Sequence, residues 1–186
     1  GYYNYINSLT KISYCISQSK ELHIGASVSH YYTDVYSYKG EGYNFDAGIL
    51  IETDTLALSI IVKNAAPNLV VNYENSEDAN YSGLENLPLQ TIYSIRYNLS
   101  DFQLYGQLKN GNRRQMTSSV GINYTPSFIP FFSISAGYKE LLVLEEVKNN
   151  FTLGLGLNLF GVSFDYAYEQ SEHILYNHKH YFSLGI

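Results

Sequence analysis

The 186-residue sequence predicts an all-β fold, an antiparallel up-and-down transmembrane β-barrel, and three observations support this prediction. Apolar and polar residues alternate in about eleven short segments, so that each strand would have one apolar and one polar face. No credible helical pattern interrupts these segments. The connections between most neighbouring segments are short enough for antiparallel hairpins.

The alternation is clearest at the C-terminal end, in the three segments 151–159, 162–169 and 178–186. In the first of them, four leucines and a phenylalanine share one face, while the other face carries threonine, glycine and asparagine. Phe182, Leu184 and Ile186 end the sequence with an apolar strand. Such an ending is typical of an outer-membrane barrel, so we interpret these three residues as a C-terminal assembly signal for the barrel-assembly machinery.

The same reasoning predicts eight earlier strands, each with a period of two. They lie at 9–17, 22–33, 44–53, 56–63, 93–99, 102–109, 116–124 and 132–138. Asn110 and Gly111 form a hairpin signal, and Pro126 and Pro130 stop the strand that precedes them. The range 66–90 has no strand pattern and contains prolines and acidic residues, so we expect one long external loop there.

The expected connections alternate in length. Short turns lie near 18–19, 53–54, 99–101, 125–130 and 160–161, and mostly longer connections lie at 34–43, 66–90, 110–114, 141–149 and 171–178. Outer-membrane barrels place short turns on the periplasmic side and longer loops outside, and single-chain bacterial barrels have an even number of strands. Eleven visible strands would leave the N-terminus outside. We therefore expect residues 1–186 to be one barrel domain that lacks at least one N-terminal strand of a 12–14-stranded barrel.

Composition excludes several classes of protein. A formal net charge of −6 argues against a nucleic-acid partner, because no basic face is available to neutralise phosphates. The single cysteine, Cys15, excludes an internal disulfide framework. Hydrophobic residues make up 45% of the chain and charged residues only 15%, which is low for a soluble domain. This balance favours a lipid-facing apolar surface over a soluble sandwich or barrel with an apolar core.

Six charged residues within strands fall on the face opposite the apolar one. They are Asp46, Lys63, Arg96, Lys139, Asp165 and Glu169. Placing a lysine or arginine on the lipid side near mid-membrane would cost roughly 2–4 kcal/mol, so we expect these residues to line the lumen. They would form either a structural salt-bridge network that fills the lumen or the polar lining of a solute path.

The sequence gives no sign of catalysis. It has no phosphate-binding glycine loop, no HExxH or CxxC motif and no nucleophile elbow, so we expect no enzyme and no cofactor. His178 and His180 could offer two ligands on one face to a metal ion, but the spacing fixes no third ligand. We therefore expect no metal site and interpret both histidines as interfacial polar residues.

Several short motifs carry a family resemblance. They are Gly42-Tyr43-Asn44-Phe45-Asp46-Ala47-Gly48, Val62-Lys63-Asn64, Leu87-Pro88, Gly154-Leu155-Gly156, Asp165-Tyr166-Ala167-Tyr168 and His180-Tyr181-Phe182-Ser183-Leu184. From about residue 40 onward the chain resembles outer-membrane proteins of the PorV/PorQ type, within the wider group similar to the FadL fatty-acid channels. The resemblance implies a barrel of about fourteen strands. The plug and kinked early strand of the FadL group have no counterpart in this sequence, so their transport mechanism is not carried over.

These observations lead to two functional hypotheses. The first is a bacterial outer-membrane barrel, in contact with the lipid bilayer, that acts as a channel or transporter for small hydrophobic or amphipathic solutes. The second is a non-transporting surface scaffold, or a secretion-associated carrier barrel, that binds secreted protein cargo or other protein partners through its external loops, chiefly 66–90. An open lumen would favour the first hypothesis, and a packed lumen the second.

Overall fold

The computed structural model describes residues 5–35, 38–66, 68–73, 81–85, 87–111, 116–143, 146–170 and 178–185. These residues form thirteen β-strands and no helix. The strands are β1 (Tyr5–Ser17), β2 (Leu22–Val35), β3 (Tyr38–Glu52), β4 (Leu56–Lys63), β5 (Asn68–Tyr73), β6 (Tyr81–Glu85), β7 (Gln90–Leu99), β8 (Phe102–Gly111), β9 (Met116–Tyr124), β10 (Phe132–Val143), β11 (Glu146–Leu159), β12 (Val162–Gln170) and β13 (His178–Gly185).

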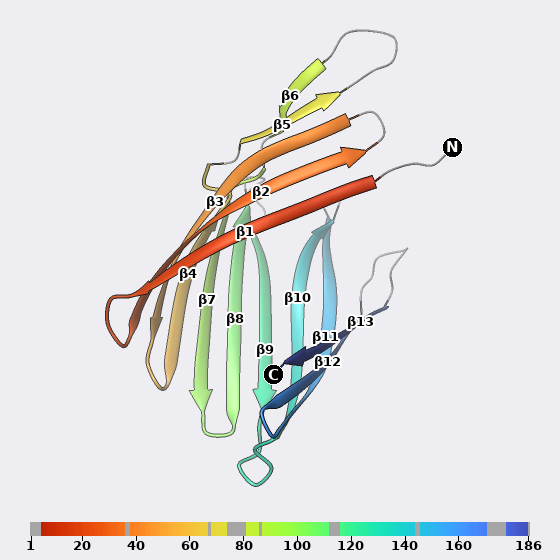
Figure 1. Cartoon of the computed structure of the whole chain (residues 1–186). Coiled ribbons are helices and arrows are strands. Elements are labelled where there is room, and N and C mark those ends of the chain that lie inside the picture. Colours follow the sequence, from red (N-terminus) through yellow and green to blue (C-terminus); the bar gives the residue numbers. More distant parts are fainter. Residues whose placement is uncertain are drawn as a thin grey trace. The chain divides into compact units, whose positions relative to one another are not determined.

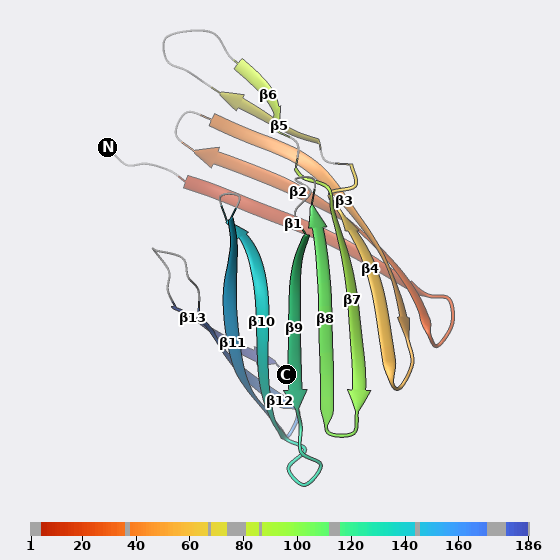
Figure 2. The ribbon, with the colours of Figure 1, turned by 180° about the vertical axis from the view of Figure 1, so that it is seen from behind.

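The strands belong to one sheet with the order β1-β2-β3-β4-β7-β8-β9-β10-β11-β12-β13 (Figure 1). Within the second half of the chain, β7, β8, β9 and β10 lie side by side in both views (Figures 1 and 2). Neighbouring strands pair antiparallel, for example β11 and β12, in which Leu155 lies opposite Tyr166 and Gly156 opposite Asp165. Eleven antiparallel up-and-down strands therefore confirm the all-β prediction, while closure into a barrel stays a prediction.

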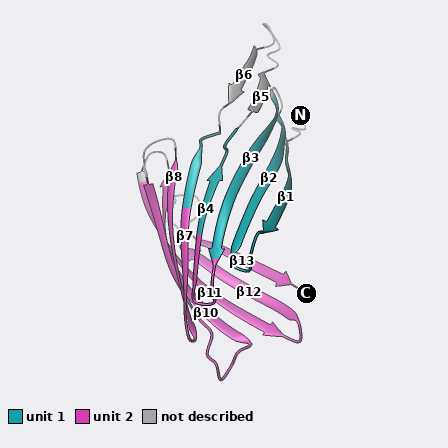
Figure 3. Cartoon of the chain, turned by 90° about the vertical axis from the view of Figure 1, so that its left-hand side faces the viewer, with its two compact units in different colours: residues 1–51, 59–92 teal, residues 52–58, 93–186 magenta. Residues whose placement is uncertain are grey.

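The chain divides into two compact units, which Figure 3 shows in different colours. Unit 1 comprises residues 1–51 and 59–92, and unit 2 comprises residues 52–58 and 93–186. Unit 1 therefore contains β1, β2, most of β3 and β4, the strands β5 and β6, and the first residues of β7. Unit 2 contains β8 to β13 and the lower part of β7, together with the turn between β3 and β4.

The structure differs from the sequence prediction at two expected loops. The ranges 34–43 and 141–149 are mostly strand, because β2 continues to Val35, β3 starts at Tyr38, β10 continues to Val143 and β11 starts at Glu146. Lys39 and Glu41 interrupt the apolar pattern, although their backbones pair with Asp34 and Tyr32 on β2. Backbone pairing thus extends the strands beyond the apolar pattern, and the expected length difference between the two sets of connections is smaller than predicted.

The range 66–90, which was expected to be one long loop, also contains regular structure. β5 pairs with residues 38–43 of β3, and β6 pairs with β5 in a hairpin. β5 reads Asn-Leu-Val-Val-Asn-Tyr, so its β-branched run favours a strand even though it is too short to show a clear period. Residues 67, 74–80 and 86 lie outside the described residues. The external location of this segment stays a prediction.

The hairpin turn between β11 and β12 has an unusual sequence. Phe160 has a φ of 54° and Gly161 a φ of 82°, so both residues are left-handed, as in a type I′ turn. Glycine adopts this conformation freely, whereas asparagine is the residue usually found before it. A left-handed backbone costs a bulky residue such as phenylalanine about 1–2 kcal/mol.

Candidate functional site

The apolar side of the strands is exposed, and almost none of it is buried as a core. Among the described apolar residues only Ala57 and Ile92 are buried, at 7% and 8% exposure. Exposed apolar residues alternate along single strands, as do Ile12, Tyr14 and Ile16 on β1. The exposed apolar residues on β11 are Val147, Phe151, Leu153, Leu155, Leu157 and Leu159. The apolar side chains that alternate along these strands are therefore exposed in the described part of the chain.

The opposite face is polar, and in unit 1 it is organised around Asp46 on β3. The Lys11 ammonium on β1 donates to Asp46 Oδ2 at 2.7 Å, and the Ser27 hydroxyl on β2 donates to the same oxygen at 3.2 Å. Asn44, which is only 2% exposed, donates to Asp46 Oδ1 at 3.2 Å. Asp46 therefore lies on the predicted face and is held by an ion pair that also involves Lys11, a residue not singled out in the sequence.

Asn64, just beyond β4, joins this network to the start of β7. Its backbone N–H donates to Asp46 Oδ1 at 3.1 Å, and its side-chain oxygen accepts a hydrogen bond from Asn44 at 2.7 Å. Its Nδ2 donates to the Pro88 carbonyl at 2.8 Å. Asn64 also has a left-handed φ of 59°, which asparagine tolerates better than most residues. Asn64 stands at the start of the segment that contains β5 and β6, and its bond to Pro88 links it to the end of that segment.

Asn64 gives a prediction that separates its two roles. Asn64→Gly keeps the left-handed backbone but removes the side-chain hydrogen bonds, and we expect it to lower the free energy of unfolding by about 1–2 kcal/mol. Asn64→Ala removes the bonds and adds backbone strain, so it should cost about 1–2 kcal/mol more. Chemical denaturation in detergent measures both. Equal losses would show that the backbone conformation carries no strain.

A groove of about 520 Å³ lies on the polar face of unit 1. Space for the groove is left by small residues such as Ser13, Gly25 and Gly48. Its charged lining residues are Lys11, Asp46 and Lys63, and apolar side chains come from Leu50 and Ile61. Its further lining residues are Tyr14, Cys15, His23, Ala26, Ser27, Ala47, Ile49 and Ser59. Lys63 is exposed and makes no ion pair with any described residue. The groove thus combines apolar walls with charged groups.

In unit 2, Arg96 on β7 forms an ion pair with Glu52 at the end of β3. Asn98, on the same face two residues further along, donates from its side chain to the Asp54 carbonyl at 2.8 Å. These contacts hold the turn between β3 and β4 against β7. The sequence suggested Arg96 for the lumen but gave no sign of its partner Glu52, because the pairing depends on strand register.

Among the described residues of unit 2, the most buried ionic group is Glu169 on β12. The Lys139 ammonium donates to Glu169 Oε2 at 2.7 Å, and Asn150 Nδ2 donates to Oε1 at 2.7 Å. Asn150 is fully buried, the Glu169 residue is 4% exposed, and the Tyr181 hydroxyl lies 3.3 Å from Oε2. The structure thus brings together two of the predicted lumen residues, Lys139 and Glu169. We call Lys139, Asn150, Glu169 and Tyr181 the Glu169 cluster.

Asp165, by contrast, is exposed and makes no hydrogen bond or ion pair with any other described residue. It lies on the polar face beside Gly156, where an added Cβ would be 3.0 Å from Asp165 Oδ1. Of the six predicted residues, four therefore take part in ion pairs, whereas Lys63 and Asp165 form none with the residues that the structure describes. Whether the six line a lumen stays a prediction.

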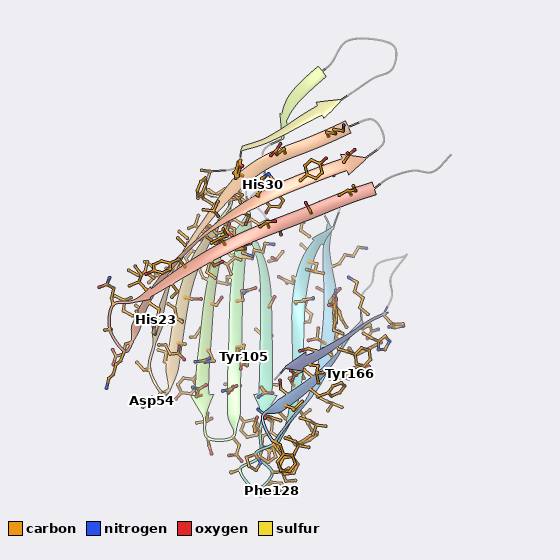
Figure 4. The ribbon with its side chains drawn as sticks, viewed as in Figure 1. His23, His30, Asp54, Tyr105, Phe128 and Tyr166 are labelled. Atoms are coloured by element: carbon orange, nitrogen blue, oxygen red, sulfur yellow. The ribbon has the colours of Figure 1, made fainter. Side chains whose placement is uncertain are left out.

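The last strand exposes the residues proposed as an assembly signal. Phe182 and Leu184 are 69% and 71% exposed on the apolar face, and Ile186 lies outside the described residues. His180 and His178 lie on the same face, where their Nδ1 atoms are 2.9 Å from the hydroxyl of Tyr166 and 2.6 Å from that of Tyr168. Figure 4 labels Tyr166 on β12. These hydrogen bonds occupy one nitrogen of each histidine, and no cluster of three metal-ligating side chains occurs among the described residues.

Asp101, in the turn between β7 and β8, joins that turn to the next one. Its carboxylate accepts hydrogen bonds from the Ser127 hydroxyl at 2.7 Å and the Ser127 backbone amide at 3.1 Å. These two bonds hold the pKa of Asp101 below its ordinary value of 3.8, and the bond from the Ser127 hydroxyl has the larger effect. A carboxyl whose pKa is lowered by folding stabilises the fold above its unfolded pKa and loses this contribution as the pH falls through the folded value.

We therefore expect Asp101→Ala to destabilise the protein at neutral pH, and the stability difference from wild type to shrink as the pH falls below about 4. Thermal unfolding in detergent across this pH range measures the difference. Asp165→Ala serves as the control, because Asp165 lacks such bonds in the described part of the chain. A difference that stays constant with pH would contradict the role assigned to Asp101.

Comparisons with known proteins supply no identity for this arrangement. A scan against models of known protein families finds no match, and a search of curated proteins finds none either. No described helix has the length and apolar character needed to cross a membrane. The resemblance to the PorV/PorQ type therefore stays a prediction.

Proposed function

We propose that this chain forms wall strands of a bacterial outer-membrane β-barrel that passes small hydrophobic or amphipathic solutes. One observation carries the proposal: the apolar residues of the strands are exposed, while the charged residues pair on the other face. In water, such an apolar surface would be unfavourable over strands of this length, because large exposed apolar patches are rare on soluble monomers. In a bilayer, the apolar face contacts acyl chains and the polar face lines the interior.

The groove of unit 1 supports solute passage rather than a fully packed interior. It lies on the same face as the Lys11–Asp46 ion pair and is hollowed by residues with small side chains. Its apolar walls suit the hydrophobic part of a solute, and Lys63 suits a polar head of negative charge. This combination favours amphipathic solutes over simple ions.

Reconstitution into planar bilayers and vesicles tests the proposal. We expect single-channel conductance, together with uptake of an amphipathic solute that protein-free vesicles do not show. Ser13→Trp fills the groove and should reduce uptake, whereas Ile12→Trp, one residue earlier on the exposed apolar face, should not. Insertion without conductance or uptake would contradict transport.

The second candidate is a scaffold or carrier barrel that binds protein partners outside the membrane, and one observation favours it. The hairpin of β5 and β6 pairs with β3, so the segment 66–90 includes a strand-built surface. Deletion of this hairpin distinguishes the two functions. A scaffold would lose partner binding while its bilayer insertion persisted, and a channel would retain its conductance.

A further inference from the structure

Three phenylalanines are exposed on two neighbouring turns at one end of unit 2. Phe160 is fully exposed at the tip of the turn between β11 and β12, and Phe128 is 78% exposed in the connection between β9 and β10 (Figure 4). Phe131 in the same connection is 45% exposed. We call Phe128, Phe131 and Phe160 the aromatic tip. Nothing else in the described part of unit 2 covers Phe160.

Internal hydrogen bonds hold these two turns together. The backbone N–H of Asn158, two residues before Phe160, donates to the Phe131 carbonyl at 2.8 Å. Ser127, next to Phe128, bonds to Asp101 in the turn between β7 and β8. These bonds hold the backbone of the two turns in place, and Phe160 has a left-handed backbone that is unfavourable for a bulky residue.

The other turns at this end of unit 2 are polar. The turn between β3 and β4 carries Asp54, and the turn between β7 and β8 carries Ser100 and Asp101. The aromatic tip is thus confined to the strands β9 to β12. The described residues 116–138 and 151–164 contain no charged side chain. The charged groups nearest in contact are the Asp101 carboxylate, whose oxygens accept hydrogen bonds from Ser127, and Asp165, which lines a hollow with Phe131. The exposed rings themselves are apolar and match an apolar partner.

The length of the apolar face on β10 and β11 indicates what that partner is. The first polar residues on that face beyond Tyr138 are Glu140 on β10 and Asn149 on β11, whose Oδ1 accepts a hydrogen bond from the Tyr138 hydroxyl at 2.7 Å. Leu142 and Val147 are exposed beyond this polar interruption. Tyr138 pairs with Phe151. From Phe151 to Phe160 the strand advances about 30 Å at about 3.3 Å per residue, which a tilt of about 40° reduces to about 23 Å across the membrane.

This span is close to the apolar band of outer-membrane barrels, which is about 25 Å tall. With Tyr138 at one boundary of the band, Phe160 falls at the opposite boundary. We propose that Phe128 and Phe160 insert into the lipid layer between headgroups and acyl chains and so anchor the sector β9–β12 at this depth. This inference rests on the proposed membrane function, and it adds a lipid contact at turns that would otherwise face water.

The absence of tryptophan from the sequence allows a direct test. Single substitutions Phe160→Trp and Phe128→Trp place one fluorescent indole in the aromatic tip. Asp54→Trp is the matched control on a polar turn of the same unit, and Leu155→Trp reports on the exposed face of β11. Each variant is reconstituted into vesicles whose lipids are brominated either near the headgroup or near the end of the acyl chain, and aqueous iodide is then added.

We expect lipids brominated near the headgroup to quench most of the indole emission of Phe160→Trp and Phe128→Trp, with little quenching by iodide. The Asp54→Trp variant should show the opposite pattern. Strong quenching by iodide at the aromatic tip would overturn the proposal. Protection from iodide and from both kinds of brominated lipid would also overturn it, because it would indicate a protein partner. If neither brominated lipid quenched the Leu155→Trp variant either, the proposed membrane function itself would be contradicted. This variant therefore distinguishes a failure of the membrane function from a failure of the proposal for the aromatic tip.

Discussion

Ile95→Lys is expected to lower the free energy of unfolding in a lipid bilayer by about 2–4 kcal/mol. Ile95 is 47% exposed on the apolar face of β7 and lies four residues before the strand ends at Leu99. With a rise of about 3.3 Å per residue and a strand tilt of about 40°, Ile95 lies about 10 Å from the turn, measured across the membrane. This is near the centre of an apolar band that is about 25 Å tall. A lysine there would lose hydration without gaining a partner.

The neighbouring substitution Ser94→Lys provides the matched control. Ser94 lies on the polar face, where its hydroxyl accepts a hydrogen bond from Gln107 Nε2 at 3.3 Å. We expect this lysine to cost less than about 1 kcal/mol, because its ammonium remains hydrated on the polar side. Urea titration of the protein in vesicles measures both changes. Similar losses for the two variants would contradict the assignment of the faces.

The second large effect is expected at Glu169. Glu169→Ala should lower the free energy of unfolding by about 2–3 kcal/mol, because Lys139 and Asn150 would lose a buried charged acceptor. The Lys139 side chain is 33% exposed, so partial rehydration keeps the loss below that of a fully buried ion pair. Glu169→Gln should be less costly, since its amide oxygen can still accept the hydrogen bond from Asn150.

Asp165→Ala, on the same strand, is the control for the Glu169 cluster. Asp165 is exposed and has no ion pair in the described residues, so we expect a change within about 0.5 kcal/mol. Chemical denaturation in detergent compares the three variants without involving the bilayer. If Glu169→Ala were as mild as Asp165→Ala, the cluster would not stabilise the sheet.

The sequence predicted the strands whose faces differ most. The alternation of leucine with glycine and threonine in 151–159 identifies both the strand and its exposed face, because a period of two has no other simple explanation. The same pattern placed Asp46, Arg96 and Glu169 opposite the apolar face. Strand ends were harder to predict, since residues such as Lys39 and Glu41 pair through their backbones without contributing to the apolar pattern.

The polar contacts themselves could not be read from the sequence. Lys11 and Asp46 are far apart in the chain, and so are Glu52 and Arg96, so each pairing depends on the register of several strands. Asn64 belongs to one of the short motifs that resemble the PorV/PorQ type, but its left-handed backbone and its hydrogen bond to Pro88 depend on the three-dimensional fold. The sequence predicted a short turn at Phe160 and Gly161 but did not predict the exposure of the Phe160 side chain.

Accessibility of single cysteines along β8 tests the central claim, that the apolar face contacts lipid and the opposite face lines a polar interior. With Cys15 replaced by serine, cysteines are introduced one at a time from Gln103 to Lys109, and the variants are reconstituted into vesicles. We expect a water-soluble maleimide to label positions 103, 105, 107 and 109 and to spare Leu104 and Leu108, whose side chains are exposed on the apolar face. Labelling without this alternation, or in the reverse pattern, would contradict the account.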